Sequence, residues 1–69
     1  MVEVFSTNVE EQAHAERLVA LLLMHFPGGK INFDLQDCDR ILRVEKQQLV
    51  PEKVIQLLHE QGYQCRILE

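Results

Sequence analysis

The residues best suited to chemistry lie together in one short segment, Asp37-Cys38-Asp39. A cysteine thiolate and two carboxylates are all metal ligands, and an exposed thiol can also act as a redox sensor. The two acidic neighbours repel a thiolate, however, and the thiolate is the form that binds metal. Asp is also common in turns, so the segment suits a turn without a chemical role. The sequence favours the turn and leaves a weak metal or redox site at Cys38 as the alternative.

The other nucleophiles and the histidines are dispersed along the chain. A nucleophilic enzyme needs an activated nucleophile with a base within hydrogen-bond reach, and Ser6 has no such base near it in the sequence. Cys65 lies in an alternating segment that predicts a buried, hydrophobic role for its side chain. His14 and His25 are expected about three turns apart on one helix, too far apart for one metal ion. We therefore predict a protein that is not an enzyme and has no cofactor and no tightly bound metal.

The elements that must position these residues follow from the hydrophobic periodicity. Alternation of apolar and polar residues predicts four strands, at residues 2–7, 31–35, 40–45 and 63–68. The first helix is indicated by an apolar stripe formed by Ala15, Leu18, Val19, Leu22 and Phe26. Pro51 suits the start of a second helix, and Gly62 suits its end. The order β-α-β-β-α-β predicts an α+β, ferredoxin-like fold, with two helices on one face of a four-stranded antiparallel sheet.

Two surfaces of such a fold are candidates for binding. Three connections are expected at one end of the molecule, and sites built from loops would lie there. The candidate residues of this loop end are Thr7, Asn8, Asp37, Cys38 and Tyr63.

The second candidate surface is the sheet face without helices. Alternation predicts that Phe5 and Ile41 point away from the helices on neighbouring strands. With Leu68 they would form a small apolar patch for self-association or partner docking, although isolated exposed hydrophobes are also normal.

The length and net charge of the chain limit the number of domains and the kinds of partner that we expect. The 69 residues allow a single domain, residues 1–69, with one small core. The net charge is −4, whereas nucleic acids and anionic membranes attract basic surfaces. No apolar run approaches the roughly 20 residues of a membrane-spanning helix. With two cysteines and no signal-peptide pattern, we expect a cytoplasmic protein without nucleic-acid or membrane partners.

The length, the element order, the first helix stripe and Gly62-Tyr63 before the last strand resemble the heavy-metal-associated domains. This is the family of small copper chaperones and of the soluble domains of metal-pumping ATPases. Its motif, Met-x-Cys-x-x-Cys, aligns with residues 6–11 and places Asn8 and Glu11 at the cysteine positions. An amide oxygen and a carboxylate are poor ligands for soft ions such as Cu(I). The resemblance therefore implies the fold of that family without its metal site.

Asn8 and Glu11 instead suggest a helix cap. Asn8 is a preferred N-cap residue, and Glu11 stands three residues later, where its carboxylate can reach the Asn8 backbone N–H. We predict that this capping box starts the first helix.

The expected function is that of a non-catalytic interaction or regulatory module, with an unidentified protein partner or self-association. Two alternatives remain open. One is a low-affinity copper or zinc carrier that uses Cys38 together with Cys38 of a second chain. The other is a regulatory domain that senses a small molecule, although no residue indicates the ligand.

Overall fold

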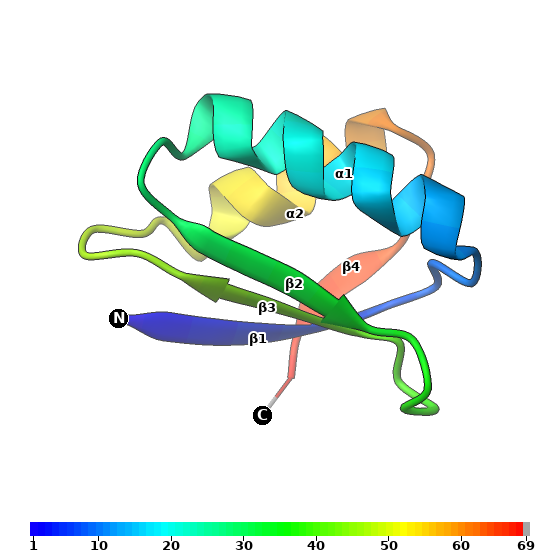
Figure 1. Cartoon of the computed structure of the whole chain (residues 1–69). Coiled ribbons are helices and arrows are strands. Elements are labelled where there is room, and N and C mark those ends of the chain that lie inside the picture. Colours follow the sequence, from blue (N-terminus) through cyan, green and yellow to red (C-terminus); the bar gives the residue numbers. More distant parts are fainter. Residues whose placement is uncertain (69) are drawn as a thin grey trace.

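The computed structural model describes residues 1–68 and contains the six predicted elements in the predicted order. They are β1 (Val2–Thr7), α1 (Gln12–His25), β2 (Lys30–Asp34), β3 (Ile41–Glu45), α2 (Pro51–Glu60) and β4 (Cys65–Ile67). The strands form one antiparallel sheet in the order β2-β3-β1-β4. Both helices cover the same face of this sheet (Figure 1). The predicted ferredoxin-like α+β fold is confirmed.

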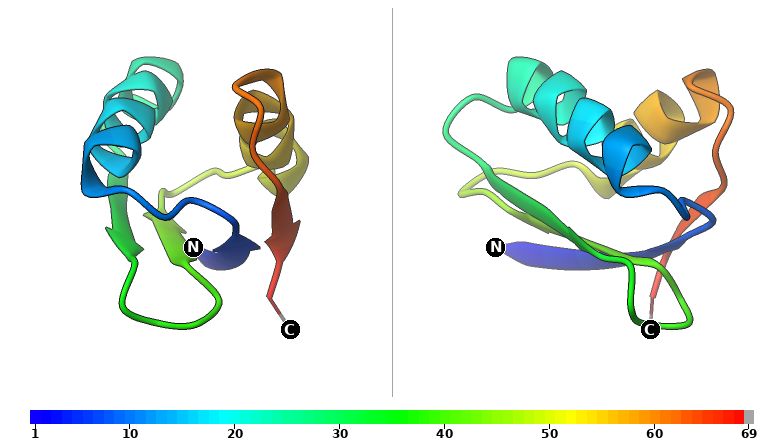
Figure 2. Two further views of the ribbon diagram at one scale, coloured as in Figure 1. Left: turned by 90° about the vertical axis from the view of Figure 1, so that its right-hand side faces the viewer. Right: turned by 45° about the vertical axis from the view of Figure 1, so that its right-hand side comes forward.

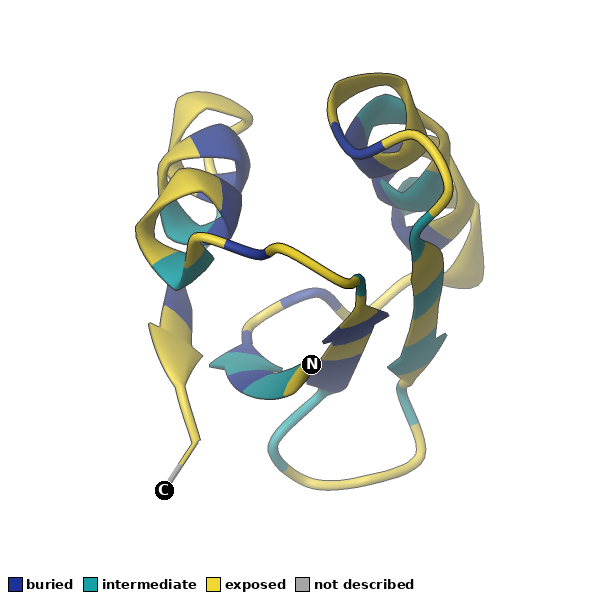
Figure 3. Ribbon diagram, turned by 90° about the vertical axis from the view of Figure 1, so that its left-hand side faces the viewer, coloured by how far each residue is buried: buried dark blue, intermediate teal, exposed yellow. Residues whose placement is uncertain are grey.

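The core fills the space between the sheet and the two helices. Figure 3 shows the buried residues on the helix surfaces that face each other and the sheet. The largest fully buried side chains are Phe5, Val9, Leu22, Leu42, Val44, Val54 and Leu58. Cys65 belongs to the same core, as predicted, and its burial raises the pKa of the thiol to about 12. Among residues 1–68, no helix is long and apolar enough to cross a membrane.

Both ends of α2 follow the predicted local signals. Pro51 occupies the first turn of α2, where its missing N–H costs no helical hydrogen bond. Gly62 follows the helix with φ of 91°, a left-handed conformation that glycine adopts without a Cβ clash. The next residue, Tyr63, donates its backbone N–H to the Leu58 carbonyl at 3.0 Å. This corner turns the chain from α2 into β4.

The predicted orientation of Phe5 is wrong. Phe5 pairs with Leu42 of β3, and both side chains are fully buried under the helices. Val2 and Val4 therefore point to the helix-free face. When the pairing of a strand shifts by one residue, every side chain of that strand moves to the other face of the sheet. In the observed pairing the Phe5 ring packs in the buried cluster that also contains Leu42 and Cys65.

Candidate functional site

The predicted loop end exists, and Thr7 holds two of its connections together. The Thr7 backbone N–H donates to the Asp39 carbonyl at 3.0 Å. The Thr7 hydroxyl donates to the Arg40 carbonyl at 2.6 Å and accepts the Val9 backbone N–H at 3.3 Å. Only 9% of Thr7 is exposed. Its hydroxyl is therefore committed to internal hydrogen bonds and is not offered to a ligand.

Asn8 joins the third connection to the same end, so the predicted capping box is wrong. Helix α1 begins at Gln12 behind the extended residue Glu11, without a side-chain cap bond. The Asn8 Oδ1 atom instead accepts the backbone N–H of Gln64 at 2.8 Å, across 56 residues of sequence. The physical reason is the intervening Val9, which is fully buried and draws the chain into the core before the helix begins.

Tyr63 lies half-buried beside α1, and its ring centroid is 6.3 Å from that of His14. It packs against both clusters of buried side chains. Its position at the loop end is as predicted, and most of its surface is used for packing. Of the predicted residues of this end, Asp37 and Cys38 are the two that lie exposed on the hairpin turn.

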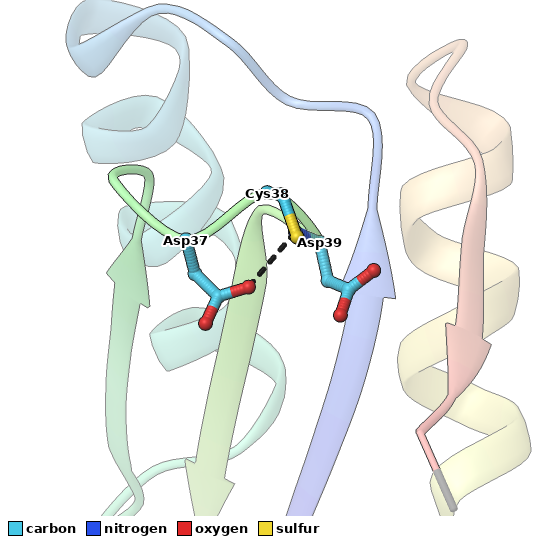
Figure 4. A group of neighbouring side chains, drawn as sticks. All are labelled: Asp37, Cys38 and Asp39. Atoms are coloured by element: carbon cyan, nitrogen blue, oxygen red, sulfur yellow. Dashed lines mark hydrogen bonds between the residues drawn. The ribbon is translucent and has the colours of Figure 1, made fainter.

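The acidic turn brings three possible metal ligands together (Figure 4). One ligand atom each from Asp37, Cys38 and Asp39 lies within 4.8 Å of the others. However, the Asp37 Oδ1 atom accepts the Asp39 backbone N–H at 2.9 Å, which closes the turn. Asp37 and Cys38 are also exposed, so water competes with them for any cation. The hydrogen bond of Asp37 therefore accounts for the turn without a bound ion.

Arg40, at the end of this turn, is a residue that the sequence analysis missed. Its φ of 47° is left-handed, which is uncommon for a residue with a side chain. The guanidinium Nη1 donates to the Leu35 carbonyl at 3.0 Å, and Nη2 lies 3.7 Å from the Glu10 carboxylate. The side chain thus fastens the loop between β2 and β3 and compensates the backbone strain. No local sequence signal marks an arginine for this conformation.

The predicted apolar patch of Phe5 and Ile41 on the helix-free face is not present. Ile41 does alternate with the buried Leu42, but only 8% of it is exposed, and the loop after β2 curls below the sheet on that side (Figure 2). The more exposed apolar side chains near this face are Val2, at 51%, and Leu68, at 36%. Val4 points to the same face and is half-buried, and the Leu68 backbone N–H donates to the Val4 carbonyl at 2.9 Å.

A different surface, the β2 edge, combines unpaired backbone with apolar side chains. We define it as strand Lys30–Asp34 together with Val19 and Leu23 of α1. Strand β2 ends the sheet, so among residues 1–68 no strand pairs with its outer side. Ile31 and Phe33 face α1 and, with Ala15 and Val19, line a shallow hollow of about 250 Å³.

Leu23 lies one turn beyond Val19 and is 41% exposed. Three polar residues, Gln12, Glu16 and Asn32, also line the hollow. The alternation of Ile31 and Phe33 predicted the strand, but only the strand order shows that one side of it is open.

Comparison of the chain with models of known protein families, with curated proteins and with solved structures finds no match in any of the three. The resemblance to heavy-metal-associated domains therefore stays a prediction from the element order and the residues quoted for it.

Proposed function

We propose that this chain is a non-catalytic protein-interaction module and that the β2 edge is its binding surface. The observation that carries the proposal is the open strand Lys30–Asp34 beside an apolar hollow. A strand added to such an edge gains main-chain hydrogen bonds, and pockets for its alternate side chains select the sequence. The proposed partner segment is therefore extended and carries apolar residues at alternate positions.

The internal bonds at the loop end also support this choice. Thr7 and Asn8 were the main candidates for a site built from loops. Their side-chain oxygens instead form hydrogen bonds with the backbone of other connections. A partner can bind the β2 edge without breaking an internal hydrogen bond, because the outer backbone groups of an edge strand face solvent.

The remaining parts of the proposal rest on charge and cysteine chemistry. The acidic net charge of −4 supports a protein partner over a nucleic acid. Cys38 and Cys65 are both free, which supports a reducing compartment such as the cytoplasm. We regard the domain as a heavy-metal-associated-like fold in which Asn8 and Glu11 replace the metal-binding cysteines.

Photo-cross-linking tests the proposed surface directly. A photoreactive residue at Asn32, exposed on β2, is expected to cross-link a protein that binds the edge. The matched control places the same residue at Gln56, exposed on α2, the helix that contacts β4 at the opposite edge of the sheet. Equal cross-linking from both positions, or none from Asn32, would contradict the proposal.

Low-affinity zinc or copper carriage is a second candidate, favoured by the close approach of Asp37, Cys38 and Asp39. A second chain's Cys38 would supply a further thiolate. The expected signature is a zinc-dependent doubling of mass in size-exclusion chromatography that disappears in Cys38→Ser. An unchanged mass with zinc, and no co-purified metal, would remove this candidate. The small-molecule-sensing alternative stays a prediction.

A further inference from the structure

We propose that the occupant of the β2 edge is a second copy of this chain, with the two β2 strands paired antiparallel about Asn32. This inference rests on the proposed function and names its partner. A twofold axis through the pair would join the two sheets into one continuous sheet, with all helices on the same face.

The sequence of β2 is self-complementary in one antiparallel register. Ile31 and Phe33 face the helices, whereas Lys30, Asn32 and Asp34 face the other side. Residues that oppose each other in an antiparallel pair lie on the same face of the sheet. Helix-facing residues of one copy must therefore oppose helix-facing residues of the other. Centred on Asn32, the strand places Ile31 against Phe33 of the second copy and Asn32 against its own counterpart.

The charges of the strand agree with this register. Lys30 and Asp34 are both exposed and stand at the two ends of β2. Around the twofold axis each Lys30 would oppose Asp34 of the other copy, which forms two cross-strand ion pairs. Opposite charges at facing positions stabilise a strand pair, and like charges destabilise it.

The neighbouring antiparallel registers pair fewer residues of β2 and do not match its charges. A shift of two residues one way places Asp34 against Gly28, in the reversal after α1. A shift the other way places Lys30 against Gln36, in the turn after β2. Each shift leaves the charged ends of β2 without their opposite charges and shortens the pairing.

The helix layer adds an apolar contact above the paired strands. Because the axis is perpendicular to the sheet, the two α1 helices would run antiparallel on either side of it. The flanks that approach each other carry Val19 and the exposed Leu23. The two hollows would meet at the axis, where Ile31 and Phe33 of both copies lie. Glu16, which also lines the hollow, is exposed in the single copy.

Charge reversal tests the register. Sedimentation equilibrium of the wild-type chain is expected to show a concentration-dependent dimer. Lys30→Asp alone, or Asp34→Lys alone, creates two like-charge pairs and is expected to weaken dimerisation at least about tenfold. The double variant Lys30→Asp/Asp34→Lys restores both pairs, and so does an equimolar mixture of the two single variants. Recovery of the dimer in both cases would support the register, whereas a dimer indifferent to all these changes would overturn it.

A disulfide trap keeps the test valid if a charge variant folds poorly. Asn32→Cys in a Cys38→Ser background places two thiols on facing residues, whose Cα atoms should lie about 4.5–5.5 Å apart. Oxidised glutathione is expected to link them rapidly, and the control Gln56→Cys in the same background should stay unlinked.

A wild-type chain that is monomeric at millimolar concentration and untrapped at Asn32 would overturn this inference. If Asn32 then still cross-links a different protein, the proposed function stands without it. The two proposals therefore fail on different results.

Discussion

Replacing Thr7 by valine should cost this domain a large part of its stability, although the two side chains have nearly the same shape. The change removes the hydroxyl that serves both the Arg40 carbonyl and the Val9 backbone N–H. Val9 is fully buried and Thr7 nearly so, which means that water cannot easily replace the lost partner. Every buried side-chain polar atom of the described residues is otherwise satisfied.

The expected loss is about 2–3 kcal/mol, because two hydrogen bonds contribute about 1 kcal/mol each and an unsatisfied buried N–H adds a desolvation cost. A domain of this size has a total stability of about 3–10 kcal/mol. The melting temperature should therefore fall by about 10–20 °C.

Urea denaturation followed by circular dichroism measures the change, with Thr7→Ser as the matched control. Serine keeps the hydroxyl and loses one methyl group, which should cost about 1 kcal/mol. Amide hydrogen exchange at Val9 should accelerate in Thr7→Val and not in Thr7→Ser. If valine proves as stable as serine at this position, the reasoning from the hydroxyl is refuted.

Three further predictions concern other contacts. Asn8→Ala should destabilise the fold by about 1 kcal/mol and speed amide exchange at Gln64, with no change in helix content; a loss of helical circular dichroism would instead support a capping role. Arg40→Gly should be about 1 kcal/mol more stable than Arg40→Ala in urea denaturation, since both lose the bond to the Leu35 carbonyl but only glycine relieves the positive φ. Burial raises the pKa of Cys65 from 9.0 to about 12, so the unfolded chain loses this proton first; stability should fall as the pH rises from 9 to 12, and the fall should be smaller in Cys65→Ala.

Local patterns were sufficient for the element order but not for the orientation of β1. The segment Val2-Glu3-Val4-Phe5 carries apolar residues in both parities, so alternation alone does not decide which set is buried. The decision comes from distant residues, because Phe5 lies between Leu42 of β3 and Ile67 of β4. The predicted patch on the helix-free face failed for this reason.

The capping box failed for a similar reason. Asn8 and Glu11 fit the local sequence pattern of a capping box. That pattern does not include the burial of Val9 or the hydrogen bond that the Gln64 N–H donates to Asn8. The β2 edge was missed because an open side is a property of the strand order and not of the strand's own sequence. The burial of Cys65, in contrast, was predicted correctly from local alternation alone.

The central position of β1 has a consequence for synthesis of the chain. Of the four strands of this sheet, β1 is synthesised first, and it pairs with residues 41–45 on one side and 65–67 on the other. Its backbone and the Phe5 ring therefore stay without their native partners until β3 has emerged, and one side of β1 stays open until β4 follows. Translation proceeds at about 5–20 residues per second, so β1 lacks its native partners for seconds, and an unpaired hydrophobic strand is prone to aggregation during that time.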